Sequence, residues 1–408
     1  MSLYQLHEVQ PENSKTSYNE YDVVDFVLPF ENRALQLNSL RIVCDINTDL
    51  AAFSAKAASA TTGEVAVNLA SNNGVFYNNL AGGHSVIDSI TTSFTNGGTI
   101  ENFTNYPRYI AMKTAATKDK CDLLNASAAC EGKTPLIKYT NTLLRGSFSS
   151  SVSGTVVGAG GTVVADQATE PFNVSFKPDF CLNNAAAQGQ QALLSHSKSG
   201  NIRVSIRLTR GASVLFGNEW TSANKYFLEN LKLTFVSRPD AVTPALTMET
   251  KTGFVQSITS DFSNIQAVVP AICKSVSASF IPQDKQNVYT EDNLQQHRLP
   301  GMTQLQFIWN DSTNTMVTYI IKRQAEVIER YLNSFNYMGK NIATLPNLQA
   351  NRGFGVGVNF GEYVNLSNQK FQVQLQSISP IYTFTDYSKC KYLKNFKIYL
   401  IILSLLYI

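Results

Sequence analysis

The residues that most often carry enzymatic chemistry are sparse in this chain and form no reactive pattern. Its four histidines are His7, His84, His196 and His297, and none lies at the spacing of a zinc-binding motif. His84 precedes Ser85, which would suit a general base beside a nucleophile, but no third partner can be identified and no G-x-S-x-G sequence occurs. The sequence therefore predicts that His84 is a turn histidine near a strand, and that the chain binds no metal.

Two pairs of carboxylates are close enough in sequence to be considered as acid and base. Asp22 and Asp25 lie three residues apart in a predicted strand, which would place them on opposite faces. Glu326 and Glu329 lie three apart in a predicted helix and would share a face, but Glu326 and Arg330 have the spacing of a surface ion pair. Neither pair lies in a recognisable apolar pocket, so no glycosidase-type pair is predicted.

The glycines and tryptophans allow a binding interpretation and a structural one. Gly355, Gly357 and Gly361 imitate a nucleotide-binding fingerprint, but they lie in or beside an alternating strand with no following helix. We expect them to permit close packing or a bend at the corner of a sandwich. Trp220 and Trp309 could form a carbohydrate platform, although sandwich cores use aromatic residues in the same way. We therefore assign no catalytic, cofactor-binding or metal-binding residue and predict that the protein is not an enzyme.

The composition indicates a β-rich protein with a weakly charged surface. The 408 residues are 44% hydrophobic and 15% charged, against about 25% charged in typical domains. This excludes a highly charged disordered chain and a coiled coil, and it suits a surface largely covered by neighbouring molecules. The net charge is only +3, and no cluster of Lys and Arg indicates specific nucleic-acid binding.

The cysteines indicate a reducing environment. No C-x-x-C pair occurs, no signal peptide is recognisable, and only Cys121 and Cys130 are close enough in sequence to form a loop disulfide. We expect all six thiols to be reduced and the five N-x-[ST] sequons to carry no glycan. The cysteines are Cys44, Cys121, Cys130, Cys181, Cys273 and Cys390, and the sequons begin at Asn102, Asn125, Asn173, Asn310 and Asn365.

The first half consists of a polar arm at 1–21 and a β-rich domain at 22–240. Regular structure is expected to end at Tyr106-Pro107, and 112–170 is expected to be an insertion with a Gly/Ser-rich loop or ribbon at Ser147–Thr162. A shift in the period-two pattern near Ser39 predicts a bulge or a break. Strands are predicted at Asp22–Phe30, Leu35–Ile46, Glu64–Leu69, Phe172–Phe176, Ile202–Thr209, Ala212–Phe216 and Tyr226–Val236, and the stretch Gly82–Ile90 leads to a further alternating run through Phe94.

The second half is a β-rich domain at 250–387, followed by an atypical hydrophobic tail at 388–408. Its one clear helix is predicted at Lys322–Phe335, with Ala325, Ile328, Leu332 and Phe335 on the apolar face. The tail could be sequence foreign to the domain, a buried strand or helix, or a membrane-surface segment; its apolar run is too short to span a bilayer. Strands are predicted at Gly253–Ile258, Ile265–Val269, Lys274–Ile281, Leu305–Trp309, Thr315–Ile321, Arg352–Phe360 and Phe371–Ser377.

Roughly eight short strands per half predict two all-β units in tandem, each a sandwich or a barrel, jelly rolls included. The order of several motifs then resembles the double jelly-roll major capsid proteins of the Polinton, adintovirus and virophage-like group. In the first half these motifs are Gly83–Ile90, Ile100-Glu101, Tyr106–Tyr109, Phe176–Pro178, Cys181–Asn183, Gly200–Leu208 and Tyr226–Phe235. In the second half they are Ile258–Val269, Val276–Phe280, Phe307–Ser312, Gln324–Phe335 and Phe354–Leu375. The tail after Tyr387 departs from the family pattern.

The resemblance implies an all-β fold of two tandem jelly-roll β-sandwiches with a few short helices. It implies a structural major capsid protein whose homotrimers form pseudo-hexagonal capsomers of an icosahedral DNA virus or virus-like integrated element. Its partners would be neighbouring capsomers, penton proteins and minor capsid proteins, in a virion assembled in the host cytoplasm or nucleus, and it would need no cofactor. The arm would order only against neighbours, and the 112–170 insertion would be an outward loop, a tower or a trimer contact. The alternatives are a penton or minor capsid protein, a carbohydrate-binding β-sandwich module, and a hydrolase on a β scaffold.

Overall fold

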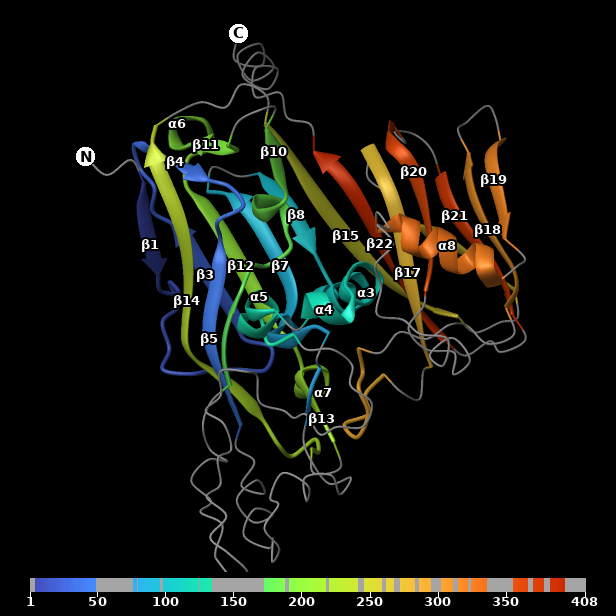
Figure 1. The fold of residues 1–408 in the computed structure, drawn as a ribbon, viewed down its shortest axis with the longest axis horizontal. Helices are drawn as coiled ribbons and strands as arrows, with labels where there is room; N and C mark the ends of the chain where they lie inside the picture. The colour runs from blue at the N-terminus through green and yellow to red at the C-terminus, as the bar shows by residue number, and fades with distance from the viewer. Residues whose placement is uncertain are drawn as a thin grey trace, which may run out of the picture.

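The computed structural model describes most of residues 4–392. The longest stretches outside the described residues are 49–75, 134–171, 295–301 and 336–354, and residues 1–3 and 393–408 also lie outside. The predicted strand Glu64–Leu69 and the segment Ser147–Thr162 therefore cannot be compared with the structure. The described strands form two β-sandwiches that lie side by side, with short helices near their junction (Figure 1).

The first sandwich is built from two antiparallel sheets that bury their inner faces in a common core. The larger sheet has the order β11-β4-β14-β5-β9, with β1 and β2 also paired to β14. Its strands are β1 (Gln5–Val9), β2 (Tyr18–Asn19), β4 (Arg33–Gln36), β5 (Arg41–Thr48), β9 (Phe172–Phe176), β11 (Leu193–Ser195) and β14 (Tyr226–Pro239). The smaller sheet, in the order β3-β12-β7-β8, consists of β3 (Val23–Leu28), β7 (Ile87–Phe94), β8 (Thr99–Phe103) and β12 (Ile202–Leu208). A short ribbon joins β6 (Phe76–Tyr77) to β13 (Leu215–Phe216).

Period-two hydrophobicity explains why these segments are strands. In β5, Ile42, Cys44 and Ile46 are buried while the residues between them are partly exposed. Because side chains alternate across a strand, every second residue meets the core. The predicted irregularity near Ser39 is a break rather than a bulge: Asn38 has a φ of 66° and separates β4 from β5. Asparagine adopts this left-handed conformation at lower cost than most residues.

The prediction that regular structure ends at Tyr106-Pro107 is wrong. These residues begin helix α3 (Tyr106–Thr117), because proline is tolerated in the first turn of a helix, where its missing N–H would be unpaired anyway. The helix is buried on most of its surface and contributes Met112 and Ala115 to the core. The start of the expected 112–170 insertion is therefore core, not an outward loop. Two short helices, α4 (Lys120–Leu123) and α5 (Ala126–Cys130), follow it.

The prediction of a strand at Ala212–Phe216 is wrong for its first three residues. Helix α7 (Gly211–Val214) occupies it, and only Leu215 and Phe216 form a strand. The apolar run is too short for periodicity to separate a buried helical turn from a strand. The other short helical elements of this half are α6 (His196–Ser199), η1 (Gly82–Val86) and η3 (Cys181–Asn183).

The second sandwich incorporates a strand from the first half of the chain. One sheet has the order β10-β15-β22-β17-β20, and β10 (Ala185–Ala187) pairs with the start of β15. Its other strands are β15 (Leu246–Ile258), β17 (Ile272–Pro282), β20 (Val356–Asn365) and β22 (Tyr382–Tyr392). The second sheet, in the order β16-β21-β18-β19, consists of β16 (Phe262–Ala267), β18 (Met302–Asn310), β19 (Thr315–Ile321) and β21 (Lys370–Ser377).

Helix α8 (Gln324–Ser334) packs on β20 and confirms the helix predicted in this half (Figure 1). Its predicted apolar face is only partly right: Ala325 is exposed, whereas Val327 and Tyr331 are buried together with Leu332 and Phe335. The buried stripe of α8 is therefore wider than predicted, because the helix packs on β20 while Tyr331 and Leu332 also belong to the core cluster of the first sandwich.

Two of the three glycines that imitate a nucleotide motif permit close packing, as predicted. A Cβ atom at Gly357 would lie 2.5 Å from Oγ of Ser334 in α8, and one at Gly355 would overlap the Ala278 carbonyl oxygen of β17. Gly361 differs: its φ of 81° favours glycine, while no described atom lies within 4 Å of the position a Cβ atom would take. The helix can therefore approach the sheet only where β20 lacks side chains.

Both ends of the chain depart from the predicted boundaries. The expectation that the N-terminal arm orders only against neighbours is wrong, because β1 pairs with β14 of the same chain and His7 stacks on Phe235 at 4.6 Å. At the other end, β22 continues to Tyr392 and pairs with β15 and β17, so the first residues of the predicted tail belong to the sheet. Among the described residues, no helix has the length and hydrophobicity needed to cross a membrane. Strands dominate, helices are few and short, and the fold is a double jelly roll.

Candidate functional site

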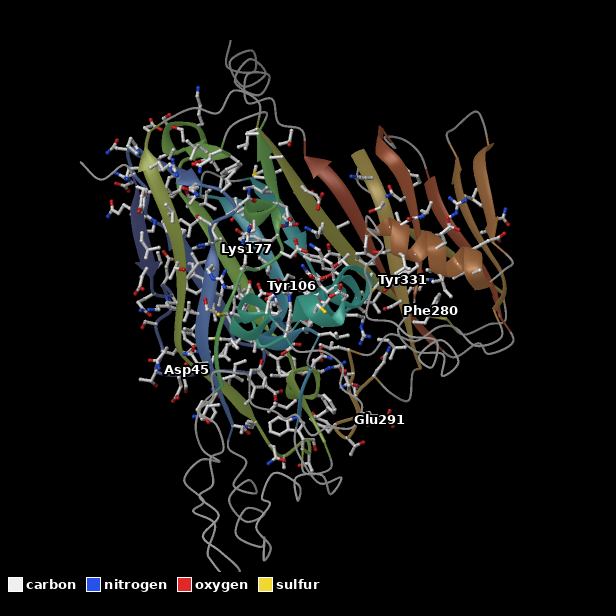
Figure 2. All side chains as sticks on the ribbon, in the orientation of Figure 1. Asp45, Tyr106, Lys177, Phe280, Glu291 and Tyr331 are labelled. Atoms are coloured by element: carbon white, nitrogen blue, oxygen red, sulfur yellow. The ribbon has the colours of Figure 1, made fainter. Side chains whose placement is uncertain are left out.

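Polar side chains from both sandwiches meet in one buried group, which we call the junction cluster. Tyr106, one of its members, lies in the middle of the molecule between the two sandwiches (Figure 2). Several motifs that the sequence singled out converge here, although they are separated by up to a hundred residues. The cluster consists of His84, Glu101, Tyr106, Lys113, Glu131, Lys133, Asp179 and Lys251.

Asp179 is the centre of the junction cluster. One carboxylate oxygen lies 3.0 Å from Nζ of Lys251 in β15, and the other lies 2.6 Å from Nζ of Lys113 in α3. The side chains of Lys251 and Asp179 are 1% and 10% exposed. Burial alone would raise the pKa of Asp179, but the two ammonium groups outweigh it and hold the pKa well below its usual value. The pair is thus fully ionised and mostly shielded from water.

Glu101 joins the two halves through backbone donors. Its two carboxylate oxygens accept the N–H of Lys251 at 2.6 Å and the N–H of Cys181 at 2.7 Å. Burial raises the pKa of Glu101 to about 7, although the Lys251 charge and the two N–H donors oppose this shift. The carboxyl group of β8 therefore fixes β15 against η3, and it changes protonation near neutral pH.

His84 is a fully buried member of the junction cluster and is unsuited to be a base. Its Nδ1 lies 2.7 Å from the Tyr106 hydroxyl and its Nε2 lies 3.4 Å from Glu131. Burial, aided by the Lys133 charge, lowers the pKa of His84 to about 4, so the ring is neutral at pH 7. The Ser85 hydroxyl is buried and has no hydrogen-bond partner among the described residues. The prediction of a structural turn histidine is confirmed, with η1 as the turn.

A second set of contacts ties residues 286–294 of the second half to the first sandwich. Asn293 donates hydrogen bonds from Nδ2 to the carbonyl oxygen of Ala212 at 2.7 Å, and its own carbonyl oxygen accepts one from Arg108 in α3. Asp292 accepts bonds from Nδ2 of Asn78 at 2.7 Å. These hydrogen bonds connect residues 286–294 to distant parts of the first half, and no local sequence pattern predicts such contacts.

An apolar layer completes the junction. The rings of Tyr109 in α3 and Phe335 after α8 are 6.0 Å apart, and Phe335 also meets Tyr331 edge-on at 5.5 Å. These residues belong to the same core cluster as the first sandwich. Figure 2 shows Tyr331 and Phe280 on the far side of the junction from Lys177. The two sandwiches thus form one continuous interior rather than two units joined by a linker.

The remaining candidate residues are not brought together. Asp22 accepts bonds from Lys15 and the Asn19 N–H, while Asp25 accepts one from Ser205. Trp220 is fully buried and donates to the Gly211 carbonyl oxygen, so it is a core residue and no carbohydrate platform. The side chain of Trp309 lies outside the described residues.

No metal or disulfide site emerges from the described part of the chain. His, Cys, Asp and Glu side chains form no group there that could hold a metal ion. Cys121 and Cys130 are free thiols, as are Cys44, Cys181 and Cys273. Most side chains of the junction cluster are buried, and its ion pairs and hydrogen bonds hold the two halves of the chain together.

The outer surface offers apolar side chains for contact with other molecules. Among the residues whose exposure the structure describes, large exposed hydrophobic side chains occur on both sandwiches. Tyr21 is held at a φ of 65° with the Arg207 guanidinium 5.7 Å from its ring centre. The exposed residues are Tyr4, Leu6, Tyr21, Val23 and Val255.

Sequence reasoning missed most residues of the junction cluster. Lys113, Asp179 and Lys251 carry no local motif, and their pairing depends on contacts across 66 and 72 residues. The available signal was indirect: the family-like motifs contain Glu101, Tyr106 and Cys181, each of which contacts the cluster or belongs to it.

Comparison with known proteins identifies the fold. No protein-family model and no curated protein matches the sequence. The structure is similar to the Faustovirus major capsid protein, with a TM-score of 0.54 and 10% sequence identity over 95% of this chain and 90% of that one. Weaker similarity extends to Sulfolobus Turreted Icosahedral Virus (TM-score 0.47, 11% identity, 96% and 92% covered) and to the mavirus major capsid protein (0.41, 10%, 94% and 86%). At such low identity, the first similarity establishes a shared fold.

Proposed function

We propose that this protein is a structural major capsid protein of an icosahedral DNA virus or of a virus-like integrated element. The observation that carries the proposal is the whole-length similarity to the Faustovirus major capsid protein, which includes both sandwiches. The closed interior of the junction cluster and the weakly charged, β-rich surface support the same function. A rigid two-sandwich block whose flanks carry exposed apolar side chains is suited to tiling a shell.

We further propose a homotrimer in which six sandwiches surround one axis, giving a pseudo-hexagonal capsomer. The motif order that resembles the Polinton, adintovirus and virophage-like group supports this assembly, and closed cyclic symmetry would bury sheet edges that otherwise aggregate. The partners would be neighbouring capsomers, penton proteins and minor capsid proteins, and the location would be the virion.

We also propose that the chain acts as two jelly-roll units, the first running from β1 to β14 and the second from β15 to β22, although β10 crosses between them. A penton protein would need only one jelly roll, and a carbohydrate-binding module would need an exposed aromatic platform. The presence of a second sandwich argues against a penton protein. The burial of Trp220 gives no support to a carbohydrate-binding module.

The deciding experiment is the mass of the full chain in solution, measured by light scattering and followed by negative-stain imaging. Three copies with a six-lobed outline are expected. Five copies would favour a penton, and a stable monomer at capsid-like concentrations would contradict the capsomer and favour a binding module.

A further inference from the structure

The N-terminal arm closes one side of the first sandwich. Strand β1 pairs with β14 and lies at the edge of the larger sheet (Figure 1). Further along the arm, Glu12 donates its N–H to the Asp25 carbonyl oxygen at 2.8 Å. Nδ2 of Asn13 donates to the Val23 carbonyl oxygen, so the arm also covers β3, the edge strand of the smaller sheet. The arm therefore protects backbone groups of both sheets that would otherwise be open.

His7 lies in the middle of β1 and contacts two other strands. Its ring stacks on Phe235 of β14, and its Nε2 lies 2.7 Å from Oγ of Ser237, also in β14. The same Ser237 oxygen lies 2.7 Å from Nε of Arg33 in β4. A guanidinium group can only donate, so the Ser237 hydroxyl accepts from Arg33. We therefore assign its own hydrogen to a bond with Nε2 of a neutral His7.

A proton on Nε2 of His7 removes this arrangement. The ring nitrogen then becomes a donor, and the Ser237 hydroxyl hydrogen loses its acceptor. Ser237 is 0% exposed, and its hydroxyl contacts only His7 and Arg33 among the described residues. A buried donor without a partner costs free energy, and two cations would now meet at one oxygen.

The other charged groups on the neighbouring strands do not relieve this conflict. Glu8 of β1 pairs with Lys232 of β14 at 3.0 Å, and Arg238 of β14 donates to Gln36. Because side chains alternate along a strand, all three charged groups lie on the face of the sheet opposite to His7. On β3, which also approaches β1, the carboxylate of Asp25 accepts a bond from β12.

Arg33 is therefore the charge that acts on His7. Partial burial, followed by the Arg33 charge, lowers the pKa of His7 from 6.5. The face of Phe235 attracts a charged ring and opposes this effect. Arg33 and the Ser237 hydroxyl outweigh that attraction, because both act directly on the nitrogen that gains the proton.

We propose that His7 is an acid-sensitive switch that loosens β1 from β14 when its ring gains a proton. The proposal does not depend on the proposed capsid function, because it follows from contacts within one chain. The neutral ring stabilises the closed β1 above pH 6.5. This stabilisation declines as the pH falls below 6.5, because the open strand binds the proton more readily than the closed one.

The remainder of the arm stays attached when β1 opens. Tyr18 is 2% exposed and belongs to the core cluster, and its hydroxyl is bonded to the Lys15 N–H and the Asn13 carbonyl oxygen. The Glu8–Lys232 pair, whose side chains are 54% and 30% exposed, holds β1 only weakly. The opening is therefore confined to β1, and it uncovers the β14 edge of the larger sheet.

The primary test is hydrogen exchange of the full chain, read by mass spectrometry on the β1 peptide and corrected for the intrinsic pH dependence of exchange. From pH 7.5 to 5.0, the opening of β1 is expected to increase by about threefold or more, since one proton permits up to about tenfold per pH unit. The β12 peptide is the internal reference and is expected to keep its protection. Equal opening of β1 at both pH values would overturn the proposal.

Two histidine variants identify the titrating group. His7→Phe keeps an aromatic ring against Phe235 but cannot take up a proton, so its β1 opening is expected to be the same at both pH values. His196→Gln changes a histidine outside the arm and is expected to keep the full wild-type response. A pH response that survives in His7→Phe would contradict the assignment to His7.

Two further variants test the mechanism. Arg33→Gln keeps a donor for Ser237 without the charge and is expected to reduce the pH response. Leu6→Cys with Val236→Cys places two thiols at paired positions of β1 and β14. The oxidised form is expected to lose the response, and reduction is expected to restore it. A response that persists in the oxidised form would show that the signal does not come from opening of β1.

Discussion

The core of the first sandwich and the junction cluster bury their side chains to a similar depth, but with different chemistry. In the core, alternate residues such as Phe26 and Ile42 pack by shape alone. In the junction cluster, Asp179, Lys251 and Glu101 are buried as charged or titratable groups that depend on specific partners. In the core, the loss of stability should therefore grow with the side-chain volume removed. In the junction cluster, it should depend on whether a buried charge keeps its partner.

The largest effect is expected where a buried charge loses its closest partner. Asp179→Ala leaves the Lys251 ammonium group buried without that carboxylate, and we expect a loss of about 3–5 kcal/mol in the free energy of unfolding. The measurement is denaturant unfolding of the purified protein. Lys15→Ala at the exposed Lys15–Asp22 pair is the matched control, with an expected cost of about 0–1 kcal/mol.

The same comparison gives a sharper test when both partners are removed. The double variant Lys251→Met with Asp179→Leu is expected to be more stable than Asp179→Ala, because no buried charge remains unpaired. Two truncations in the sandwich core, Phe26→Ala and Phe103→Ala, are instead expected to cost more together than either does alone, at about 3–5 kcal/mol each. If the Lys251→Met/Asp179→Leu variant were as unstable as Asp179→Ala, the junction would respond to lost side-chain volume in the same way as the core.

The pH dependence of the unfolding free energy is the next property expected to distinguish the junction from the apolar core. The pKa of Glu101 is raised from 4.5 to about 7, so the folded state favours the protonated form. The resulting stability is fully present below pH 4.5 and is lost as the pH rises through 7, by about 3 kcal/mol at about 1.4 kcal/mol per pH unit.

The measurement is the stability of the wild type minus that of Glu101→Gln between pH 4.5 and 8. The subtraction removes the opposite contribution of His84, whose pKa lowered to about 4 costs stability as the pH falls below 6.5. A difference that does not change with pH would show that Glu101 is not the titrating group.

A smaller loss of stability is expected at the uncharged contact between helix α8 and strand β20. Gly357→Ala places a Cβ atom 2.5 Å from Oγ of Ser334 and should cost about 1–3 kcal/mol by moving α8 off β20. Gly98→Ala is the control, since its nearest neighbour is 3.8 Å away. Thermal unfolding of both variants measures the difference, and equal costs would place α8 elsewhere.

The smallest effect concerns contacts between copies and rests on the proposed function. With 15% charged residues, trimer contacts should be mainly apolar and backbone-mediated, so raising NaCl from about 0.1 to about 1 M should weaken the trimer only slightly. Sedimentation at both salt concentrations measures this. Dissociation into monomers at high salt would show that charge holds the copies together.

Sequence patterns predicted the sandwiches well and the junction poorly. Period-two alternation located β3, β5, β12 and β14, because a half-buried strand leaves that pattern in its own residues. The Pro107 of α3 was misread, since proline ends a strand but also begins a helix.

The pairing of Asp179 with Lys251 leaves no local trace, because it is decided by how two distant elements pack. The residues missed on α8, Val327 and Tyr331, were missed for the same reason: the helix serves two partners, and its apolar stripe is wider than a single-face pattern. What the sequence could not predict therefore lies mainly at the junction.

Strand β10 has a consequence for how the protein is made. It emerges from the ribosome with the first sandwich, and the second sandwich then completes its sheet by adding β15 to it. Synthesis from N to C terminus therefore makes β10 available before its partner β15 exists. A truncated chain that stops near Asp240 would present β10 as an open strand without its partner, and such a fragment would be prone to aggregate.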